Sequence, residues 1–256
     1  MAEAARVKVA VVTGASRGIG RAIAERLAQD GHMVVVNYCE NQSAAAAVVK
    51  TISDSGGSAF ALQADVGKLA SIRAFYEALD RELMRRTGAP LFDVLVNNAG
   101  IAPVETIDQV SEELFDRVFA INVKGPFFMT QLGLSRMRDG GRIINMSSLV
   151  SRAAFPGYAA YAPSKGALNV FTTQQAAALG GRGITVNAIA PGATDTDINA
   201  QWLRGNADAA KAVAGMTALG RVGQAADIAG VAAFLASADS AWVTGQYIEV
   251  SGGARL

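Results

Sequence analysis

The feature that most constrains the fold is an alternation of two kinds of segment along nearly the whole chain. Short runs of β-branched and other apolar residues, such as "VAVV" and "DVLV", alternate with longer stretches whose apolar residues have helical spacing. Runs that are apolar throughout fit strands buried on both faces, as in a parallel sheet covered by helices on both sides. The alternation therefore predicts an α/β fold with a doubly wound sheet.

Each predicted element can be placed on the chain. Seven strands are predicted at Val7–Thr13, Met33–Tyr38, Ala59–Ala64, Phe92–Asn97, Arg142–Ser147, Ile184–Ile189 and Tyr247–Val250. Helices are predicted at Gly20–Gln29, Ser43–Ser55, Leu69–Arg86, Glu112–Met137, Ala160–Leu179 and Ala226–Ala236. No repeat or linker divides the chain, so residues 1–256 are predicted to form a single domain with a seven-stranded parallel sheet. A long segment without either pattern, near residues 191–219, is predicted to be a mobile substrate flap.

Composition excludes several other classes of protein. The formal net charge of the 256 residues is +1, so no electrostatic attraction favours nucleic acid as a partner. Cys39 and His32 are the only residues of their types, which excludes an internal disulfide and a Cys/His zinc cluster. A Ser-His-Asp hydrolase would need His32, which lies in a polar "QDGH" turn. We therefore predict no metal site and expect both residues to be inert and on the surface.

The beginning of the sequence, "MAEAARVKV", lacks the long apolar segment of a signal peptide. No uninterrupted apolar run approaches the length that spans a membrane. We expect a cytoplasmic protein without a membrane partner.

A glycine-rich turn separates the first predicted strand from the first predicted helix. The stretch "VVTGASRGIG" places Gly14, Gly18 and Gly20 at the spacing G-x-x-x-G-x-G, which differs from the G-x-G-x-x-G dinucleotide fingerprint. Glycine lets backbone amides approach a phosphate without a Cβ in the way, and a helix N-terminus adds positive potential. By itself the turn fits either a phosphate site or a plain strand-to-helix connection.

Three further motifs give the turn a context. "NNAG" ends the fourth predicted strand, "YAPSK" places Tyr161 and Lys165 four residues apart, and "PGATDTDI" follows the sixth strand. In this order the four motifs resemble the short-chain dehydrogenase/reductase family, and most closely its 3-oxoacyl-[acyl-carrier-protein] reductase branch. The resemblance covers nearly the whole chain. It implies a Rossmann fold, an NAD(P)-dependent short-chain oxidoreductase, and a homotetramer built through helices around Leu114–Met137 and Tyr161–Leu179.

Reduction of a ketone by a nicotinamide needs a proton donor, and Tyr161 is the candidate. The Lys165 ammonium, one helical turn away, is expected to lower the tyrosine pKa from its usual value near ~10. The resemblance adds Ser148, thirteen residues before Tyr161, to hold the substrate oxygen, with the other serines of "MSSLVS" as alternatives. It also adds Asn122 as the fourth catalytic residue, which in the family holds a water that links the lysine to solvent.

NADP is favoured over NAD as the cofactor. In related NAD-binding domains an acidic residue at the end of the second strand binds the adenosine ribose, whereas the uncharged Asn37 stands there. Arg17, inside the glycine turn, is positioned to face the 2′-phosphate of NADP. Glu40 could approach the ribose instead, so NAD stays an alternative. The resemblance implies a cofactor site formed by Gly14, Ser16, Arg17, Gly18, Ile19, Gly20, Asn37, Tyr38, Asp65, Val66, Asn97, Asn98, Ala99, Gly100, Tyr161, Lys165, Pro191, Gly192, Thr194 and Thr196.

The predicted substrate pocket is largely apolar and holds few basic residues, which fits a ketone on an acyl chain or ring better than a sugar phosphate. Its predicted residues are Ser148, Ala153, Phe155, Tyr158 and Trp202. We therefore predict an NADPH-dependent carbonyl reductase of fatty acid biosynthesis that acts on a 3-oxoacyl thioester or a related ketone. Acyl carrier protein is a candidate partner, with a basic patch formed by Arg117, Lys124, Arg136 and Arg152.

Two other hypotheses stay open. One is an NAD(P)-dependent alcohol dehydrogenase that oxidises a sterol, a polyol or a secondary metabolite. The other is a nucleotide-binding scaffold or sensor without turnover. The complete set of four candidate catalytic residues counts against the second, because a protein without turnover has no chemical need for all of them.

Overall fold

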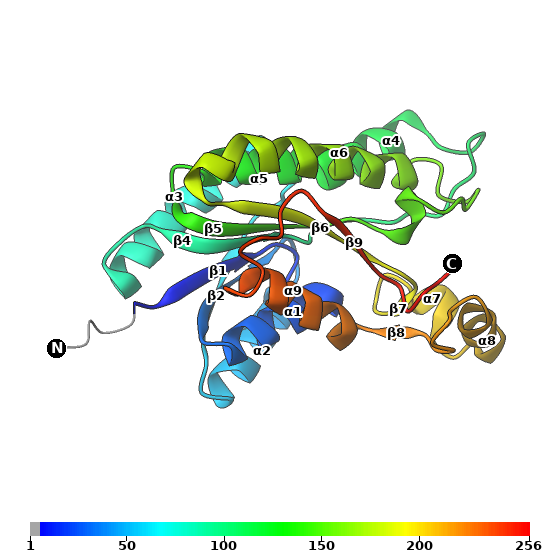
Figure 1. Ribbon diagram of the computed structural model, residues 1–256, viewed down its shortest axis with the longest axis horizontal. Coiled ribbons are helices and arrows are strands. Elements are labelled where there is room, and N and C mark those ends of the chain that lie inside the picture. Colours follow the sequence, from blue (N-terminus) through cyan, green and yellow to red (C-terminus); the bar gives the residue numbers. More distant parts are fainter. Residues whose placement is uncertain (1–5) are drawn as a thin grey trace.

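The computed structural model describes residues 6–256 and contains one large sheet in which all neighbouring strands are parallel (Figure 1). Its seven strands lie in the order β3-β2-β1-β4-β5-β6-β9. Their bounds are β1 Lys8–Val12, β2 His32–Tyr38, β3 Ser58–Gln63, β4 Phe92–Asn97, β5 Met137–Met146, β6 Thr185–Pro191 and β9 Tyr247–Val250. The order runs outward from β1 in both directions, as in a doubly wound Rossmann fold, and the predicted fold class is confirmed.

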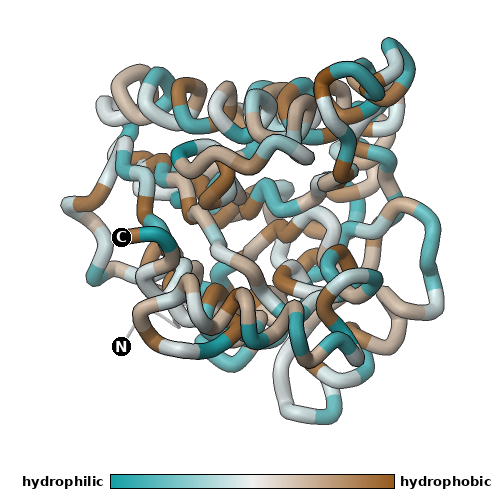
Figure 2. Tube along the Cα trace, turned by 90° about the vertical axis from the view of Figure 1, so that its right-hand side faces the viewer, coloured by the Kyte–Doolittle hydropathy of each residue, from teal (hydrophilic) through white to brown (hydrophobic). Residues whose placement is uncertain are grey.

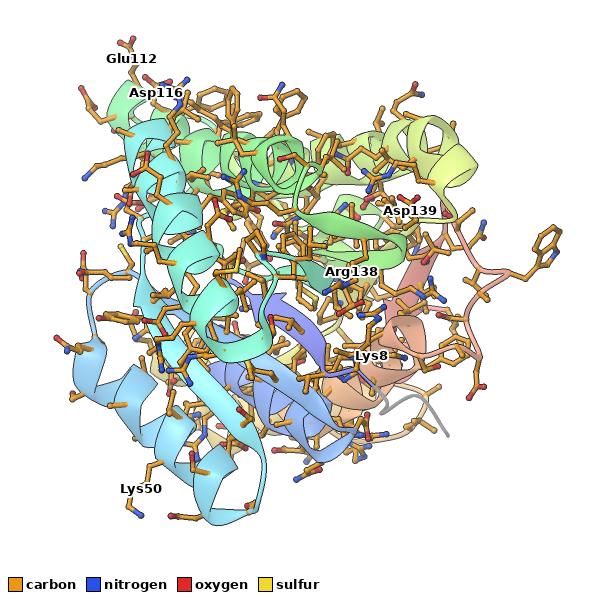
Figure 3. The ribbon with its side chains drawn as sticks, turned by 90° about the vertical axis from the view of Figure 1, so that its left-hand side faces the viewer. Lys8, Lys50, Glu112, Asp116, Arg138 and Asp139 are labelled. Atoms are coloured by element: carbon orange, nitrogen blue, oxygen red, sulfur yellow. The ribbon has the colours of Figure 1, made fainter. Side chains whose placement is uncertain are left out.

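Helices cover both faces of this sheet (Figure 1). One face carries α1 (Gly18–Gln29), α2 (Gln42–Asp54) and α9 (Ala225–Ala236). The other carries α3 (Leu69–Thr87), α4 (Glu112–Phe119), α5 (Gly125–Gly133) and α6 (Tyr161–Leu179). Charged side chains on the outer surfaces of α2 and α4 point away from the sheet, as Figure 3 shows for Lys50, Glu112 and Asp116.

The strands supply two cores because successive side chains point to opposite faces. Val11 of β1 belongs to the buried cluster that contains Phe75 of α3, whereas Val12 belongs to the cluster that contains Ile23 of α1. Both faces are covered, so the central residues of β1 and β4 are a continuous apolar run, "VAVV" in β1 and "VLV" in β4, rather than alternating with polar residues. Figure 2 shows hydrophobic segments of the trace running between the two helical layers.

The extents of the predicted helices agree with the structure to within two residues, with one exception. The predicted helix Glu112–Met137 is wrong in extent. In the structure α4 is followed by a π-helical turn, η1 (Ala120–Lys124), and then by α5, which ends at Gly133. The chain then turns directly into β5, which begins five residues before the predicted start at Arg142.

Two features explain where this helix changes and ends. Pro126 has no amide N–H to donate to the carbonyl four residues earlier, and just before it the Gly125 amide donates to the carbonyl of Ala120. At Gly133 an added Cβ would lie 2.6 Å from the Tyr76 hydroxyl, so this position requires glycine, which disfavours continuation of a helix. The residues from Met137 onward, whose apolar spacing suggested a longer helix, belong to β5.

The segment near residues 191–219 has more regular structure than the sequence suggested. It contains β7 (Thr194–Asp195), α7 (Ala200–Leu203) and α8 (Ala207–Gly215), and β7 pairs with β8 (Gly223–Gln224) in a separate two-stranded sheet. The expectation that this segment lacks regular secondary structure is therefore wrong. Its role as a mobile substrate flap stays a prediction. Residues 6–256 also contain two 3₁₀ turns, η2 (Leu149–Ser151) and η3 (Gly180–Arg182).

His32 is buried, contrary to the surface position expected for it. It is the first residue of β2, its side chain is almost wholly covered, and its Nδ1 lies 3.2 Å from the Leu27 carbonyl oxygen. Burial lowers the pKa of the imidazole. The polar turn before it is so short that the chain enters the sheet at once. Cys39 is exposed, as expected.

Among residues 6–256, no helix combines the length and the apolar character that crossing a membrane requires.

Candidate active site

A large cavity opens at the edge of the sheet where the parallel strands end. Its volume is about 1390 Å³. The loops after β1, β2, β4, β5 and β6 line it together with the segment that contains α7 and α8. Ligands bind at this edge of open α/β sheets, where the strand order reverses, here between β1 and β4. The structure therefore brings together motifs that lie far apart in the sequence.

The cavity has two halves, which differ in the elements that line them. We name them the cofactor half and the substrate half after the predicted residues that each mainly contains. The cofactor half is lined by residues Gly14, 16–20, Asn37, Glu40, 64–66 and 98–100, from the turns after β1 to β4. The substrate half is lined by residues 101–104, 148–150, Phe155, Tyr158, 196–199, Gln201, Trp202, 212–213, 216–217 and 254–255. Tyr161 and Lys165 line the cavity as well, on the first turns of α6.

The glycine turn fits a phosphate group. Gly14 and Gly18 have φ angles of 60° and 57°, a region that side-chain-bearing residues rarely adopt. A Cβ on Gly20 would lie 2.4 Å from the Gly14 carbonyl oxygen, so the turn can close only with glycine there. The N-cap residue Arg17 makes no side-chain cap and the first turn of α1 holds no acidic residue. The free amides and positive end of α1 thus lie beside the cavity.

Asn37 holds this turn in place. Its Oδ1 accepts a hydrogen bond from the Gly14 amide at 3.2 Å, and its Nδ2 donates to the carbonyls of Leu62 and Ala64, each at 3.3 Å. A carboxylate here would face both carbonyl oxygens without a proton to donate. The packing of the turn therefore explains the missing acid at this position, and the charged residues Arg17 and Glu40 both line the cavity nearby.

Most of the predicted cofactor residues line the cavity, and two do not. Tyr38 is buried in the core cluster beside α1 and α2. Asn97 is buried under the loop after β4, where its Nδ2 donates to Asn145 Oδ1 at 2.9 Å. Those that do line it are Gly14, Ser16, Arg17, Gly18, Ile19, Gly20, Asn37, Asp65, Val66, Asn98, Ala99, Gly100, Tyr161, Lys165, Pro191, Gly192, Thr194 and Thr196.

Tyr161 and Lys165 lie next to each other, as their spacing predicts. Tyr161 begins α6, and the Lys165 Nζ is 5.7 Å from the centre of its ring. The lysine is buried and donates a hydrogen bond to the Met146 carbonyl at 2.7 Å. Burial disfavours the ammonium and lowers the pKa of Lys165 to about 8.

The pKa of Tyr161 moves in the opposite direction from the one expected. Desolvation of its hydroxyl raises the pKa to about 12, and a hydrogen bond with Ser148 only partly opposes this rise. The predicted lowering of this pKa by Lys165 is not among the causes of the shift; the Lys165 ammonium instead donates to the Met146 carbonyl. At neutral pH the Tyr161 hydroxyl keeps its proton, as a proton donor must.

The structure distinguishes Ser148 from its neighbour. Ser148 and Tyr161 both line the cavity, and the Ser148 side chain acts to lower the pKa of Tyr161. The Ser147 hydroxyl instead donates to Asn169 Oδ1 at 2.6 Å, within the protein. Ser148 is therefore the serine placed to touch a substrate oxygen beside Tyr161.

Asn122 lies in the π-helical turn and is fully buried. Its side chain binds both backbone groups of Ile101: the Oδ1 accepts from the amide at 3.0 Å and the Nδ2 donates to the carbonyl at 2.9 Å. The Nδ2 also donates to Ser164 Oγ at 3.1 Å. A Cβ on Gly100 would lie 3.2 Å from Asn122 Oδ1 and 3.5 Å from Lys165 Nζ, so both side chains lie against Gly100.

The substrate half has an aromatic wall. The Phe155 and Tyr158 rings are 6.3 Å apart, and the Tyr158 and Tyr161 rings are 5.5 Å apart. Trp202 of α7 also lines this half, and its Nε1 donates to Asn199 Oδ1. Ala153 does not line the cavity: it packs beneath Phe155 in a small buried cluster.

Sequence reasoning missed Arg255. Its guanidinium stacks on the Phe155 ring at 4.1 Å and donates to the Ala154 carbonyl at 2.9 Å, and the residue lines the substrate half. The sequence held a signal for this residue, because its last predicted strand, β9, was expected to be parallel to the other strands. The residues that follow it must arrive at the same edge of the sheet as the site.

Charged and metal-binding groups can also be placed. Residues 6–256 contain no group of three or more His, Cys, Asp or Glu side chains arranged to hold a metal ion. Of the predicted basic patch, Arg136 pairs with Asp80 and Arg152 pairs with Glu249. These two cations are therefore already bound to carboxylates of the same chain.

Comparison with known proteins agrees with this geometry. The family model described as enoyl-(acyl carrier protein) reductase, which is a short-chain dehydrogenase/reductase model, matches residues 14–255. The chain belongs to the short-chain dehydrogenase/reductase family. It is thus an oxidoreductase of this family, and the resemblance to the family drawn from the motifs is confirmed at the level of the family.

Three similar proteins illustrate the range of the family. An uncharacterised oxidoreductase of Methylorubrum extorquens is 46% identical over 97% of this chain and 98% of its own length. Versicolorin reductase 1 of Aspergillus parasiticus is 40% identical, over 96% of each chain. The crystal structure of the angucycline C-6 ketoreductase LanV with bound NADP has a TM-score of 0.92 at 46% identity, covering 97% of this chain and 95% of that chain. A second LanV structure, with NADP and rabelomycin, has a TM-score of 0.89 at 44% identity, covering 98% and 97%.

Proposed function

We propose that this protein is an NADPH-dependent carbonyl reductase that acts on a flat, multi-ring aromatic ketone of secondary metabolism. The observation that carries the proposal is the placement of Tyr161 beside Ser148 and Lys165, at a cavity whose substrate half has an aromatic wall. The names of two similar proteins support it: versicolorin reductase 1, and LanV, a ketoreductase crystallised with NADP and rabelomycin.

Each group of the chain has a task in this reaction, for which NADPH supplies the hydride. Tyr161 donates its proton to the carbonyl oxygen as that oxygen gains negative charge. Ser148 donates a hydrogen bond to the same oxygen and holds it beside Tyr161. Lys165 provides positive charge next to the tyrosinate that remains. Asn122 keeps the loop after β4 in place. Its role in holding a water stays a prediction.

Arg17 supports NADP over NAD. Its side chain is exposed at the cavity, and no carboxylate of residues 6–256 pairs with it, so its charge is available for a 2′-phosphate. The amides at the start of α1 would hold the pyrophosphate, and Asp65 and Val66 would lie against the adenine. NADP-bound LanV agrees with this preference.

The aromatic wall favours a ring system over a linear acyl chain. Flat aromatic rings gain stacking energy against Phe155, Tyr158 and Trp202, whereas an acyl thioester gains only apolar contact. The ion pairs of Arg136 and Arg152 also reduce the charge available to an acidic carrier protein. A 3-oxoacyl thioester, acyl carrier protein and a place in fatty acid biosynthesis therefore stay predictions without further support. Oxidation of a secondary alcohol is the same chemistry in reverse.

Cofactor binding tests the proposal first. NADPH and NADH are titrated separately into the protein, and quenching of its tryptophan fluorescence is followed. We expect NADPH to bind at least about tenfold more tightly, because an additional charge-assisted contact contributes about 1.4 kcal/mol or more. The Arg17→Ala variant should lose this preference, whereas Arg21→Ala, whose arginine pairs with Glu25, should keep it. Equal or tighter binding of NADH by the natural chain would overturn the NADP assignment.

Substrate preference is tested next. Consumption of NADPH is measured with rabelomycin and with acetoacetyl thioester as probes. We expect higher kcat/KM for the multi-ring ketone. A clear preference for the thioester would restore the acyl substrate, and oxidised cofactor turning over only with alcohols would favour the dehydrogenase. Cofactor binding without turnover of any of these would favour a sensor.

The homotetramer stays a proposal that exposed apolar side chains support. Phe115, Phe127 and Val170 are exposed on α4, α5 and α6, on the helices through which assembly is predicted. Size-exclusion chromatography with light scattering measures the mass directly. A monomer at micromolar concentration would exclude the tetramer.

A further inference from the structure

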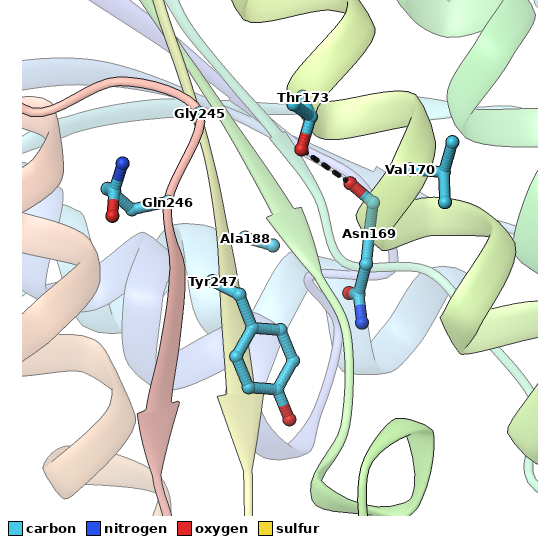
Figure 4. A pocket seen from close by; sticks show the side chains of 7 residues that line it. All are labelled: Asn169, Val170, Thr173, Ala188, Gly245, Gln246 and Tyr247. Carbon is cyan, nitrogen blue, oxygen red and sulfur yellow. Dashed lines mark hydrogen bonds between the residues drawn. The ribbon is translucent and has the colours of Figure 1, made fainter.

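Three polar side chains from separate elements meet behind Ser148. They are Ser151 of η2, Asn169 of α6 and Tyr247 of β9, and none of them lines the large cavity. Asn169 and Tyr247 instead line a second, small cavity of about 180 Å³ between α6 and β9. Figure 4 shows the Tyr247 hydroxyl and the Asn169 amide pointing toward the same end of this small cavity.

The carbonyl of Ser148 is the point on which these contacts converge. It accepts hydrogen bonds from the Ser151 amide at 3.1 Å, from the Ser151 hydroxyl at 2.7 Å and from the Tyr247 hydroxyl at 3.2 Å. Tyr247 and Ser148 are 99 residues apart in the sequence, so this contact is a tertiary one. The carbonyl therefore has donors both from its own turn and from the edge strand of the sheet.

Asn169 extends the same network to both sides of Ser148. Its Nδ2 donates to Ser151 Oγ at 3.0 Å, and its Oδ1 accepts from Ser147 Oγ at 2.6 Å. Each donating hydroxyl of this network therefore has an acceptor. Ser147 donates to Asn169, and both Ser151 and Tyr247 donate to the Ser148 carbonyl.

Little else in the local backbone fixes the direction of the Ser148 side chain. The residue is extended, with φ −164° and ψ 153°, and precedes a turn of only three residues. Within that turn its hydroxyl accepts only a long contact from the Val150 amide, at 3.4 Å. The direction of the hydroxyl therefore depends on how firmly its own peptide unit is held.

We propose that Tyr247, acting with Ser151 and Asn169, is a positioning residue that holds the main chain of Ser148 so that its hydroxyl stays aimed at Tyr161 and at the substrate oxygen. The proposal deepens the proposed function, on which its catalytic part rests. It assigns a role in the reaction to β9, an edge strand that contributes nothing to the motifs of the family. A displacement of about 1 Å at a reacting group can lower a rate by up to about a hundredfold, so a hydroxyl outside the site can matter.

The Tyr247→Phe variant tests this role, because it removes only the hydroxyl. We expect about a tenfold loss of kcat for ketone reduction, with the affinity for NADPH unchanged. Ser151→Ala should have a similar effect, and the double variant should lose less than the product of the two, because both donate to one carbonyl. The matched control is Gln246→Ala, which lines the same small cavity but whose side chain bonds only the Thr244 carbonyl.

A second measurement does not depend on turnover. The Ser148 side chain lowers the pKa of Tyr161, so displacement of Ser148 should raise that pKa. In protein labelled with ¹³Cζ-tyrosine, the Tyr161 signal is identified by its loss in Tyr161→Phe. At a high pH at which the protein is still folded, the ionised fraction of Tyr161 should be smaller in Tyr247→Phe than in the natural chain, and unchanged in Gln246→Ala.

The outcomes separate the two proposals. If the natural chain reduces no ketone but Tyr161 titrates later in Tyr247→Phe, the proposed function fails and the positioning of Ser148 stands. If Tyr247→Phe matches Gln246→Ala in both kcat and titration, the positioning role is overturned, whatever the substrate.

Discussion

The two halves of the active-site cavity are held together in different ways. In the cofactor half, side chains bind the backbone of neighbouring turns: Thr13 Oγ1 accepts from the amides of Asn98 and Ala99 at 2.9 and 3.0 Å, and Asn98 Nδ2 donates to the carbonyls of Thr13 and Gly14. In the substrate half, apolar side chains such as Val104 and Ile198 are more than half exposed.

This difference predicts how each half responds to substitution. The turns of the cofactor half are tied to the strands by buried hydrogen bonds, so a substitution there disturbs the fold and the cofactor together. In the substrate half the backbone at Ile101 and Ser148 is held in a similar way, whereas side chains of the segment around α7, such as Trp202, bond mainly within that segment. A substitution in the α7 segment therefore alters mainly the shape of the pocket. The following predictions test this comparison.

The largest effect is expected at Tyr161, where the halves meet. Tyr161→Phe removes the proton donor while keeping the ring, and we expect turnover to fall by about three orders of magnitude for every ketone. Affinity for NADPH, followed by tryptophan quenching, should change little. Near-normal reduction by this variant would show that another group donates the proton.

A methyl group in the cofactor half should damage both stability and cofactor binding. Gly20→Ala brings a Cβ within 2.4 Å of the Gly14 carbonyl oxygen and Asn98 Nδ2, and we expect a loss of about 1–3 kcal/mol in the free energy of unfolding. Denaturant unfolding and NADPH titration measure the two effects. Gly230→Ala in α9 is the control, because its Cβ meets nothing within 4 Å and should not destabilise. Equal stability of the two variants would contradict the tight packing of the turn.

Removing the buried cation should stabilise the ligand-free protein. The pKa of Lys165 falls from its usual 10.5 to about 8 on folding, which costs about 3 kcal/mol at neutral pH. Lys165→Met removes that cost but loses the hydrogen bond to Met146, so we expect a net gain of about 2 kcal/mol at pH 7, with turnover abolished.

The pH dependence of stability tests whether the buried lysine is the cause. Between about pH 8 and 10.5 the unfolded chain binds the proton and the folded chain does not, so the stability of the natural chain rises with pH in this window. The advantage of Lys165→Met should therefore shrink across the same window. An advantage independent of pH would mean that the lysine is not the cause.

The smallest effect is expected in the substrate half. Trp202→Ala removes part of the aromatic wall, and we expect KM for a multi-ring ketone to rise about fivefold to tenfold, with NADPH affinity and stability almost unchanged. Trp242→Ala is the control, since Trp242 is 99% exposed and lies outside the cavity. A large loss of stability in Trp202→Ala would remove the contrast between the halves.

Residues close together in the sequence determined much of this protein. The strand and helix periods predicted the layers, because burial on both faces imposes an apolar pattern that any window of the chain reveals. Tyr161 and Lys165 were found because four residues make one helical turn, and Ser148 followed from the resemblance at a fixed spacing. The glycine turn was found because glycine tolerates φ angles that other residues avoid.

The tertiary structure alone decided the roles that depend on distant partners. Asn37 could not be recognised as the side chain that holds the Gly14 amide, because its partners Leu62 and Ala64 lie at the end of β3 and just after it. The burial of His32, the stacking of Arg255 on Phe155 and the contact of Tyr247 with Ser148 depend likewise on which strands are neighbours. A hydrogen bond between residues 99 positions apart leaves no period in the sequence. It exists only because the sheet order brings β9 beside β6, and thus next to the turn after β5.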